Sequence, residues 1–140
     1  MNGKSLSHSK TVLVVDDDLS TCLFFKSLLT MEGLEVETAF DGKTALSLIR
    51  ENPDRRFDLV ILDLMMPGHG GYELLKELEQ PRYPRMPIFV VTAFSLDKAL
   101  IDMIQHERDV LEYWSKPIDT REFRARVHEI LGTTSPTYKK

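Results

Sequence analysis

The chain has 140 residues, of which 42% are hydrophobic and 29% charged, and its formal net charge is −4. This length suits one compact globular domain, and the acidic balance argues against direct nucleic-acid binding. Cys22 is the only cysteine, which excludes an internal disulfide, argues against a Cys-based zinc site and fits a reducing compartment. No apolar run is long enough for a signal peptide or a membrane span, so we expect a cytoplasmic protein.

Five short apolar segments alternate with five helical patterns along the chain. In the first helix Leu23, Phe24, Leu28 and Met31 recur near one face, and Asp41 is placed to cap the second helix. The predicted strands are Thr11–Val15, 34–40, 57–62, 87–91 and 110–114. The predicted helices are Leu19–Met31, a segment from Asp41 through Ile49, 72–78, 94–106 and 119–131.

This alternation predicts an α/β fold, a doubly wound parallel sheet of five strands with five helices. Strands that are buried on both faces are continuously apolar, as the first, third and fourth are. Glu35 and Glu37 in the second strand and Glu112 in the fifth place those two strands at the edges. Short right-handed crossovers then favour the order 2-1-3-4-5. Ligands bind such sheets where the chain reverses direction, here between the first and third strands.

Aspartates follow both strands that flank this switch point. Asp16 and Asp17 come directly after the first strand, and Asp63 comes directly after the third. Like charges held together are costly unless they are protonated or share a cation. Carboxylate oxygens suit Mg²⁺, which keeps waters that a phosphate can replace, so the cluster predicts a phosphoryl-transfer site. A single aspartate would more simply cap the helix that follows, and we interpret Asp18 in that way.

The next two strands end on groups that can hold a phosphoryl group. Thr92 could direct its hydroxyl toward a phosphoryl oxygen, Ala93 leaves room beside it, and Lys116 supplies a positive charge. Taken singly, threonine is an ordinary strand residue and a lysine at a strand end is usually solvated. Together with the aspartates they favour a site for a phosphoryl group and a metal ion.

Four segments resemble the marks of the bacterial response-regulator receiver domain, the CheY-like fold. They are "VLVVDDD" (12–18), "DLVILDLMMPGHGG" (58–71), "VVTAF" (90–94) and "YWSKPI" (113–118). The run Asp-x-x-Met-Pro-x-x-x-Gly is fairly specific, and the four segments in this order are highly specific. The resemblance covers residues 11–131, which leaves 1–10 as a flexible N-terminal segment and 132–140 as a tail or linker.

The resemblance implies a phosphoacceptor of a two-component signalling system. Asp63 would take a phosphoryl group from the phosphohistidine of a sensor histidine kinase or a phosphotransfer protein. Asp17 and Asp63 would bind Mg²⁺ directly, with the Met65 backbone carbonyl as a further ligand, and Asp16 would act mostly through water. Such a domain is a signalling module that assists its own phosphorylation and dephosphorylation, and we do not expect an enzyme.

The resemblance also implies a switch. Lys116 would neutralise the phosphoryl charge, and Thr92 would hydrogen-bond to the phosphoryl group. Tyr113 would rotate inward when the domain is phosphorylated. The alternative is that Tyr113 is an ordinary edge-strand residue that does not change position. The bond between Lys116 and Pro117 would be cis. The fourth helix, fifth strand and fifth helix would form the readout surface, where a homodimer could form. The downstream effector protein or domain stays unspecified.

Two departures from the family pattern matter. Gly70 stands where the family commonly has aspartate. Met65 and Phe94 lie two residues beyond the strand-end aspartate and threonine, at sites that in the family flank the path of the hydrolytic water. Because these side chains are bulky and apolar, we expect a comparatively long-lived phosphorylated form.

Three other interpretations share parts of this pattern. A haloacid-dehalogenase-like phosphatase needs a second acid two residues after its nucleophile, where Met65 stands. A flavodoxin-like cofactor binder needs a loop whose N–H groups face a phosphate, whereas "DDDLS" would repel one. A receiver-like domain that acts only as an interaction module, without metal, is disfavoured by the complete set of strand-end residues.

Overall fold

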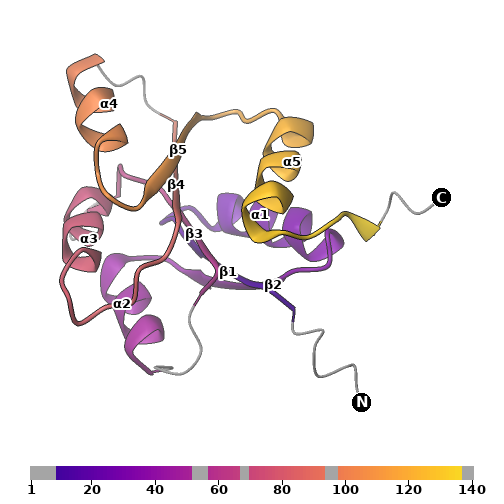
Figure 1. The fold of residues 1–140 in the computed structure, drawn as a ribbon, viewed down its shortest axis with the longest axis horizontal. Coiled ribbons are helices and arrows are strands. Elements are labelled where there is room, and N and C mark those ends of the chain that lie inside the picture. Colours follow the sequence, from indigo (N-terminus) through magenta and orange to yellow (C-terminus); the bar gives the residue numbers. More distant parts are fainter. Residues whose placement is uncertain (1–8, 52–56, 67–69, 94–97, 137–140) are drawn as a thin grey trace.

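A computed structural model describes residues 9–51, 57–66, 70–93 and 98–136 (Figure 1). Within these residues five parallel strands form one sheet in the order β2-β1-β3-β4-β5, which confirms the predicted fold class and strand order. The strands are β1 Thr11–Val15, β2 Glu35–Ala39, β3 Leu59–Leu62, β4 Ile88–Thr92 and β5 Val110–Ser115. The helices are α1 Leu19–Met31, α2 Gly42–Glu51, α3 Gly71–Leu78, α4 Lys98–Gln105 and α5 Thr120–Leu131.

The burial of the strands follows their composition. Every residue of β1, β3 and β4 is buried, whereas β2 and β5 lie at the edges and are partly exposed. Interior strands of a parallel sheet are covered on both faces, so apolar side chains are favoured at every position. The glutamates of β2 and β5 were therefore a sound guide to the edges.

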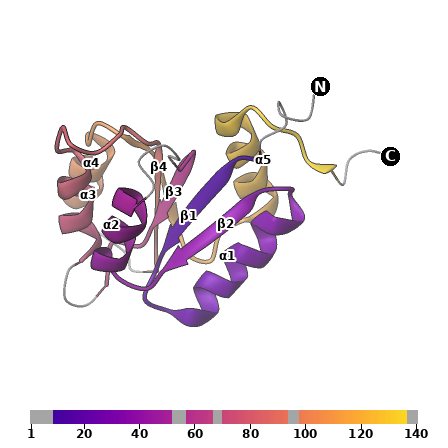
Figure 2. The same cartoon turned by 90° about the horizontal axis from the view of Figure 1, so that it is seen from below.

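Helices cover both faces of the sheet, with α1 and α5 on one side and α2, α3 and α4 on the other (Figures 1 and 2). Successive strand residues point to opposite faces. Val12 and Val14 therefore pack with α1 and α5, whereas Leu13 and Val15 pack with the other three helices. Trp114 packs against the α1–α5 cluster, with its ring centroid 5.0 Å from that of Phe123.

The apolar face predicted for α1 is not the one that meets the core. Cys22, Phe25 and Leu29 are buried, while Phe24 is 44% exposed and Met31 is 69% exposed. The helix carries apolar side chains on both sides, so their spacing alone could not select the buried face. The exposed apolar side chains of α1 therefore form a surface that the core does not use.

Aspartates cap the first two helices as predicted. Asp18 accepts a hydrogen bond from the Thr21 N–H at 3.0 Å, and Asp41 accepts one from the Thr44 N–H at 2.7 Å. The predicted start of the fourth helix falls at residues 94–97, outside the described residues, and α4 ends at Gln105. Among the described helices none is both long and apolar enough to cross a bilayer.

The turn from β3 into α3 packs backbone directly on backbone. A Cβ atom at Gly71 would lie 2.2 Å from the carbonyl oxygen of Asp63 and 2.5 Å from the Cα atom of Leu64. The Gly71 N–H also donates to the Leu64 carbonyl at 3.2 Å. Glycine is required here by this close approach, and it sets the start of α3 directly behind Asp63.

We expect Gly71→Ala to destabilise the protein by about 3 kcal/mol or more, because the added methyl group meets backbone that cannot move independently of Asp63. Urea denaturation measures this loss. Gly70→Ala is the matched control. Its Cβ would first meet the end of the flexible Glu73 side chain, so we expect a loss below about 1 kcal/mol. Equal losses in the two variants would contradict the packing argument.

Candidate functional site

The backbone hydrogen bonds of the sheet continue one residue beyond three strands and fix the site. The Asp16 N–H donates to the Ala39 carbonyl at 3.1 Å, and the Asp63 N–H donates to the Val15 carbonyl at 2.9 Å. The Lys116 N–H donates to the Thr92 carbonyl at 2.9 Å. Each of these three predicted site residues thus starts from a backbone position that the sheet determines.

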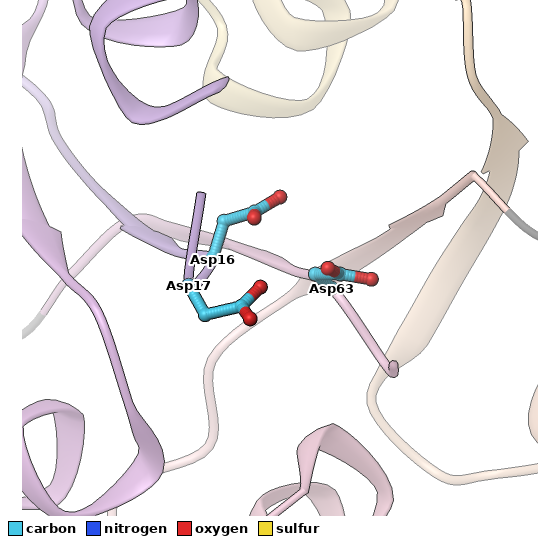
Figure 3. Close-up of side chains that lie close together, drawn as sticks. All are labelled: Asp16, Asp17 and Asp63. Atoms are coloured by element: carbon cyan, nitrogen blue, oxygen red, sulfur yellow. The ribbon is translucent and has the colours of Figure 1, made fainter. Parts of the chain in front are cut away.

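Three carboxylates meet at this edge of the sheet, as Figure 3 shows. One oxygen from each of Asp16, Asp17 and Asp63 lies within 4.8 Å of the others. Asp16 and Asp63 are buried, whereas Asp17 is exposed. An all-oxygen set of this size, open to solvent on one side, could hold a hard cation that keeps some of its water.

Lys116 reaches into the same cluster. Its Nζ donates to Asp16 Oδ2 at 2.9 Å and lies 4.0 Å from Asp63 Oδ2. The other oxygen of Asp16 accepts the Asp18 N–H at 2.9 Å. Asp16 has the close ion pair with Lys116, whereas Lys116 stays 4.0 Å from Asp63, so Asp17 and Asp63 are the better placed of the three to bind a cation directly.

Asp63 combines burial with like charge. Burial raises the pKa of this carboxyl to about 6; the neighbouring Asp16 and Asp17 add to the rise, and the Met65 N–H and Lys116 oppose it. The Met65 N–H donates to Asp63 Oδ1 at 3.1 Å. The second oxygen, Oδ2, is the one that faces Lys116. A cation in the cluster would favour the ionised, nucleophilic form.

The remaining predicted residues lie at the ends of β4 and β5. Thr92 is fully buried, and Tyr113 is partly buried against the core cluster on the α4 side. The peptide bond between Lys116 and Pro117 is cis, as the resemblance implied. The Met65 side chain is 45% exposed. Phe94 and His69 lie outside the described residues, so the expected effect of Met65 and Phe94 on the phosphorylated form stays a prediction.

Sequence reasoning missed an apolar surface next to the site. One groove of about 420 Å³ runs between α1 and the loop after β5, and its lining includes Phe24 and Lys116. A second groove along α1 is lined by Leu23, Phe24, Ser27, Leu28 and Met31. Phe24 lines both grooves, so apolar surface extends from Lys116 along α1. The sequence did contain an indication of this surface, because the segment that forms α1 has more apolar residues than one buried face needs.

Comparison with known proteins identifies the family. Residues 12–128 match the model of the response regulator receiver domain. The chain is 39% identical over 122 residues to the transcriptional regulatory protein CpxR of Klebsiella pneumoniae, covering 86% of this chain and 48% of CpxR. It is 34% identical over 126 residues to the transcriptional regulatory protein ZraR of Salmonella typhimurium, covering 90% of this chain and 27% of ZraR. The chain thus spans about half of one relative and about a quarter of the other.

Solved structures of receiver domains support the same family. The receiver domain protein from Methanospirillum hungatei superposes with a TM-score of 0.75 at 29% identity, covering 89% of this chain and 95% of that one. The receiver protein from Burkholderia phymatum gives 0.76 at 30% identity, covering 91% and 99%. The chain belongs to the response regulator receiver family, the phosphoacceptor domains of two-component signalling systems.

The ionised Asp63 should destabilise the folded protein, mainly because it is buried and also because Asp16 and Asp17 are close. Its folded pKa of about 6 lies above the ordinary value of 3.8, so the folded state binds this proton more tightly and stability falls as the pH rises from about 4 to 6. Asp63→Asn should therefore raise the free energy of unfolding by about 1–3 kcal/mol at pH 7.5 without divalent ions. The gain should shrink at pH 4.5 and when Mg²⁺ is added to both proteins.

Urea denaturation at the two pH values measures this effect. Asp109→Asn is the control, because Asp109 is also buried but forms ion pairs with Arg85 and Arg108. We expect this variant to lose stability at pH 7.5. A loss of stability in Asp63→Asn as well would contradict the claim that burial and neighbouring acids make the ionised Asp63 unfavourable.

Proposed function

We propose that this receiver domain is phosphorylated on Asp63 in a Mg²⁺-dependent reaction with a histidine kinase or a phosphotransfer protein. The observation that carries the proposal is the placement of Lys116 Nζ at 4.0 Å from Asp63 Oδ2, within a cluster of three carboxylates. A cation, a buried nucleophile and acidic metal ligands are the parts that phosphoryl transfer to a carboxylate needs. We place the domain in the cytoplasm, where such donors act.

Asp63 Oδ2 would attack the phosphorus of a donor phosphohistidine, so that an O–P bond forms as the P–N bond breaks. The Met65 N–H would hold the other oxygen in place. Mg²⁺ held by Asp17, Asp63 and the Met65 carbonyl, with Asp16 acting through water, would neutralise charge on the phosphoryl oxygens. Lys116 would then turn from Asp16 toward the phosphoryl group.

Readout would follow from the same groups. Thr92 would donate its hydroxyl to the phosphoryl group, and Tyr113 would move inward on the neighbouring strand. Met103 on α4 and Leu111 on β5 are about half exposed and lie on the proposed readout and homodimer surface. The phosphorylated domain would act by binding an effector through this surface and would not itself turn over a substrate.

Incubation with Mg²⁺ and acetyl phosphate, followed by intact-protein mass spectrometry, tests the phosphoacceptor. The protein should gain the mass of one phosphoryl group, and Asp63→Asn or removal of Mg²⁺ with EDTA should abolish the gain. Asp58→Asn is the control, because Asp58 binds the Thr11 N–H away from the site, and this variant should still be labelled.

The other readings give different results in this assay. A phosphatase would consume acetyl phosphate without a lasting adduct, and a metal-independent interaction module would gain no mass. A flavin binder would be purified with its coloured cofactor. Labelling that survives in Asp63→Asn would disprove the assignment of the nucleophile.

The exposed face of α1 is the surface on which we expect the phosphodonor protein to dock. Its grooves reach Lys116, so a protein bound along α1 would lie directly beside Asp63. Leu23 is 56% exposed, and exposed apolar patches of this kind commonly mark interaction sites. A small phosphodonor such as acetyl phosphate needs no such surface.

Replacing Leu23 and Phe24 together by alanine should therefore slow phosphoryl transfer from a histidine kinase by about tenfold or more. Labelling by acetyl phosphate should be unchanged, because the chemistry at Asp63 is intact. The kinase used is the one in a purified panel that labels the unaltered protein fastest. Met103→Ala, on α4, is the control. A double variant that is labelled by the kinase at the normal rate would exclude α1 as the docking surface.

A further inference from the structure

The segment that follows α5 folds back onto the body of the domain. Gly132 ends α5 in the left-handed conformation, with φ at 70°. The Thr133 N–H then donates to the His128 carbonyl at 3.0 Å. Four residues after Gly132, the ring of Pro136 lies 3.7 Å from the position that a Cβ atom would take at Gly33. Figure 1 shows this segment passing beside the turn between α1 and β2.

A buried acid and a buried histidine lie beneath the segment. Glu32, at the end of α1, and His128, on α5, are both less than a tenth exposed. His128 Nε2 lies 2.9 Å from Glu32 Oε1, and the second Glu32 oxygen lies 3.5 Å from Arg124 Nε. The phosphoacceptor site uses none of these groups, because they lie at the opposite end of the sheet.

Both side chains extend their contacts to the folded-back segment. His128 Nδ1 lies 2.7 Å from the Thr133 hydroxyl, and Ser135 hydrogen-bonds to Glu32. Burial alone would raise the pKa of Glu32, but the hydrogen bonds of Ser135 and His128 and the charge of Arg124 outweigh it and hold that pKa below its ordinary value. The carboxylate is therefore ionised at neutral pH and accepts hydrogen bonds from α5 and from the segment at once.

The histidine contacts tolerate either protonation state of the ring. Nε2 faces a carboxylate and so carries a proton in both states. Nδ1 faces a hydroxyl, which can donate to a neutral ring and accept from a charged one. Either state of the ring therefore keeps its contacts with both Glu32 and Thr133.

We propose that residues 133–136 form a strap that fixes the direction in which the chain leaves α5. The strap is joined through Glu32 and His128 to the ends of α1 and α5, so it moves with the body of the domain. Anything that follows the strap starts beside the α1–β2 turn, at the end of the sheet opposite Asp63. This inference is independent of phosphorylation, since all its contacts belong to the unmodified protein.

The direction of the chain after α5 matters for signalling because CpxR and ZraR are longer than this chain. The chain covers 48% of CpxR and 27% of ZraR. A flexible linker lets a neighbouring domain sample many orientations. A strap held by buried groups removes that freedom at the four residues that follow Gly132. A following domain would then be placed by the receiver from a defined point on its surface.

The test removes the two strap hydroxyl groups that contact the buried pair, those of Thr133 and Ser135, while leaving the pair in place. In the double variant Thr133→Val and Ser135→Ala, hydrogen exchange of the backbone amide of residue 133, relative to the intrinsic rate of the residue present and followed by NMR in the full 140-residue protein, should accelerate by about ten- to a hundredfold. The urea midpoint of the whole domain and its labelling by acetyl phosphate should change little. Glu32→Gln should accelerate the same amide, because it removes the charge that both partners bind.

Arg126→Gln is the matched control. Arg126 lies on the same helix and pairs with Glu112 and Glu129, so its loss should leave the exchange of Thr133 unchanged. An exchange rate in the unaltered protein equal to that of an unstructured peptide would overturn the proposal. Identical exchange in the unaltered protein and in both strap variants would overturn it as well.

A distance measurement tests the fixed direction itself. Spin labels at Lys26→Cys and Thr134→Cys, both exposed positions, should give one narrow distance distribution in the otherwise unaltered protein. The buried Cys22 is not expected to react, since burial raises the pKa of its thiol to about 11. The distribution should broaden when Ser135→Ala and Glu32→Gln are added. A broad distribution before those changes would show that the strap does not hold the chain.

Discussion

The structure depends on holding three carboxylates together against their own repulsion. The sheet imposes this arrangement, because Asp16 and Asp63 each donate the first hydrogen bond beyond a buried strand. Lys116 offsets only part of the charge: it pairs closely with Asp16 and stays 4.0 Å from Asp63. Asp63 is left buried with a pKa raised to about 6, mainly by burial. The folding free energy of the α/β scaffold thus maintains an acid cluster that could hold a cation. A cation bound there would favour the ionised form of Asp63, so metal binding and the charge of Asp63 would be linked.

The edge strand β5 connects this cluster to both layers of helices. Tyr113 and Trp114 are adjacent, so their side chains point to opposite faces of the sheet. Tyr113 packs on the α4 side, whereas Trp114 packs with Phe123 of α5. The buried Nε1 of Trp114 has no hydrogen-bond partner among the described residues, which is an unusual cost for a core tryptophan. Because Lys116 comes directly after β5, a shift of the end of this strand would move groups on both faces of the sheet.

Most of the fold could be predicted because the rules that govern parallel sheets act locally on sequence. Continuous apolar runs identified the interior strands, and the glutamates of β2 and β5 identified the edges. The aspartate cluster followed from the strand order, since the carboxyl ends of parallel strands meet at one edge. The buried face of α1 could not be predicted, because apolar residues lie on both sides of that helix. The contact of Glu32 with His128 joins residues 96 positions apart, and nothing in either local sequence indicates it.

Helix α1 connects the two ends of the molecule. It begins at Asp18, whose N–H binds Asp16 in the site, and it ends at Glu32, which is held by α5 and the strap. Between these ends it packs on α5, with the rings of Phe25 and Phe123 5.3 Å apart. A helix fixed at both ends and along one face loses little conformational entropy when a partner binds its other face. The exposed side of α1 is therefore pre-organised, and the contacts that fix the helix on the core also prepare a surface that extends to Lys116, beside Asp63.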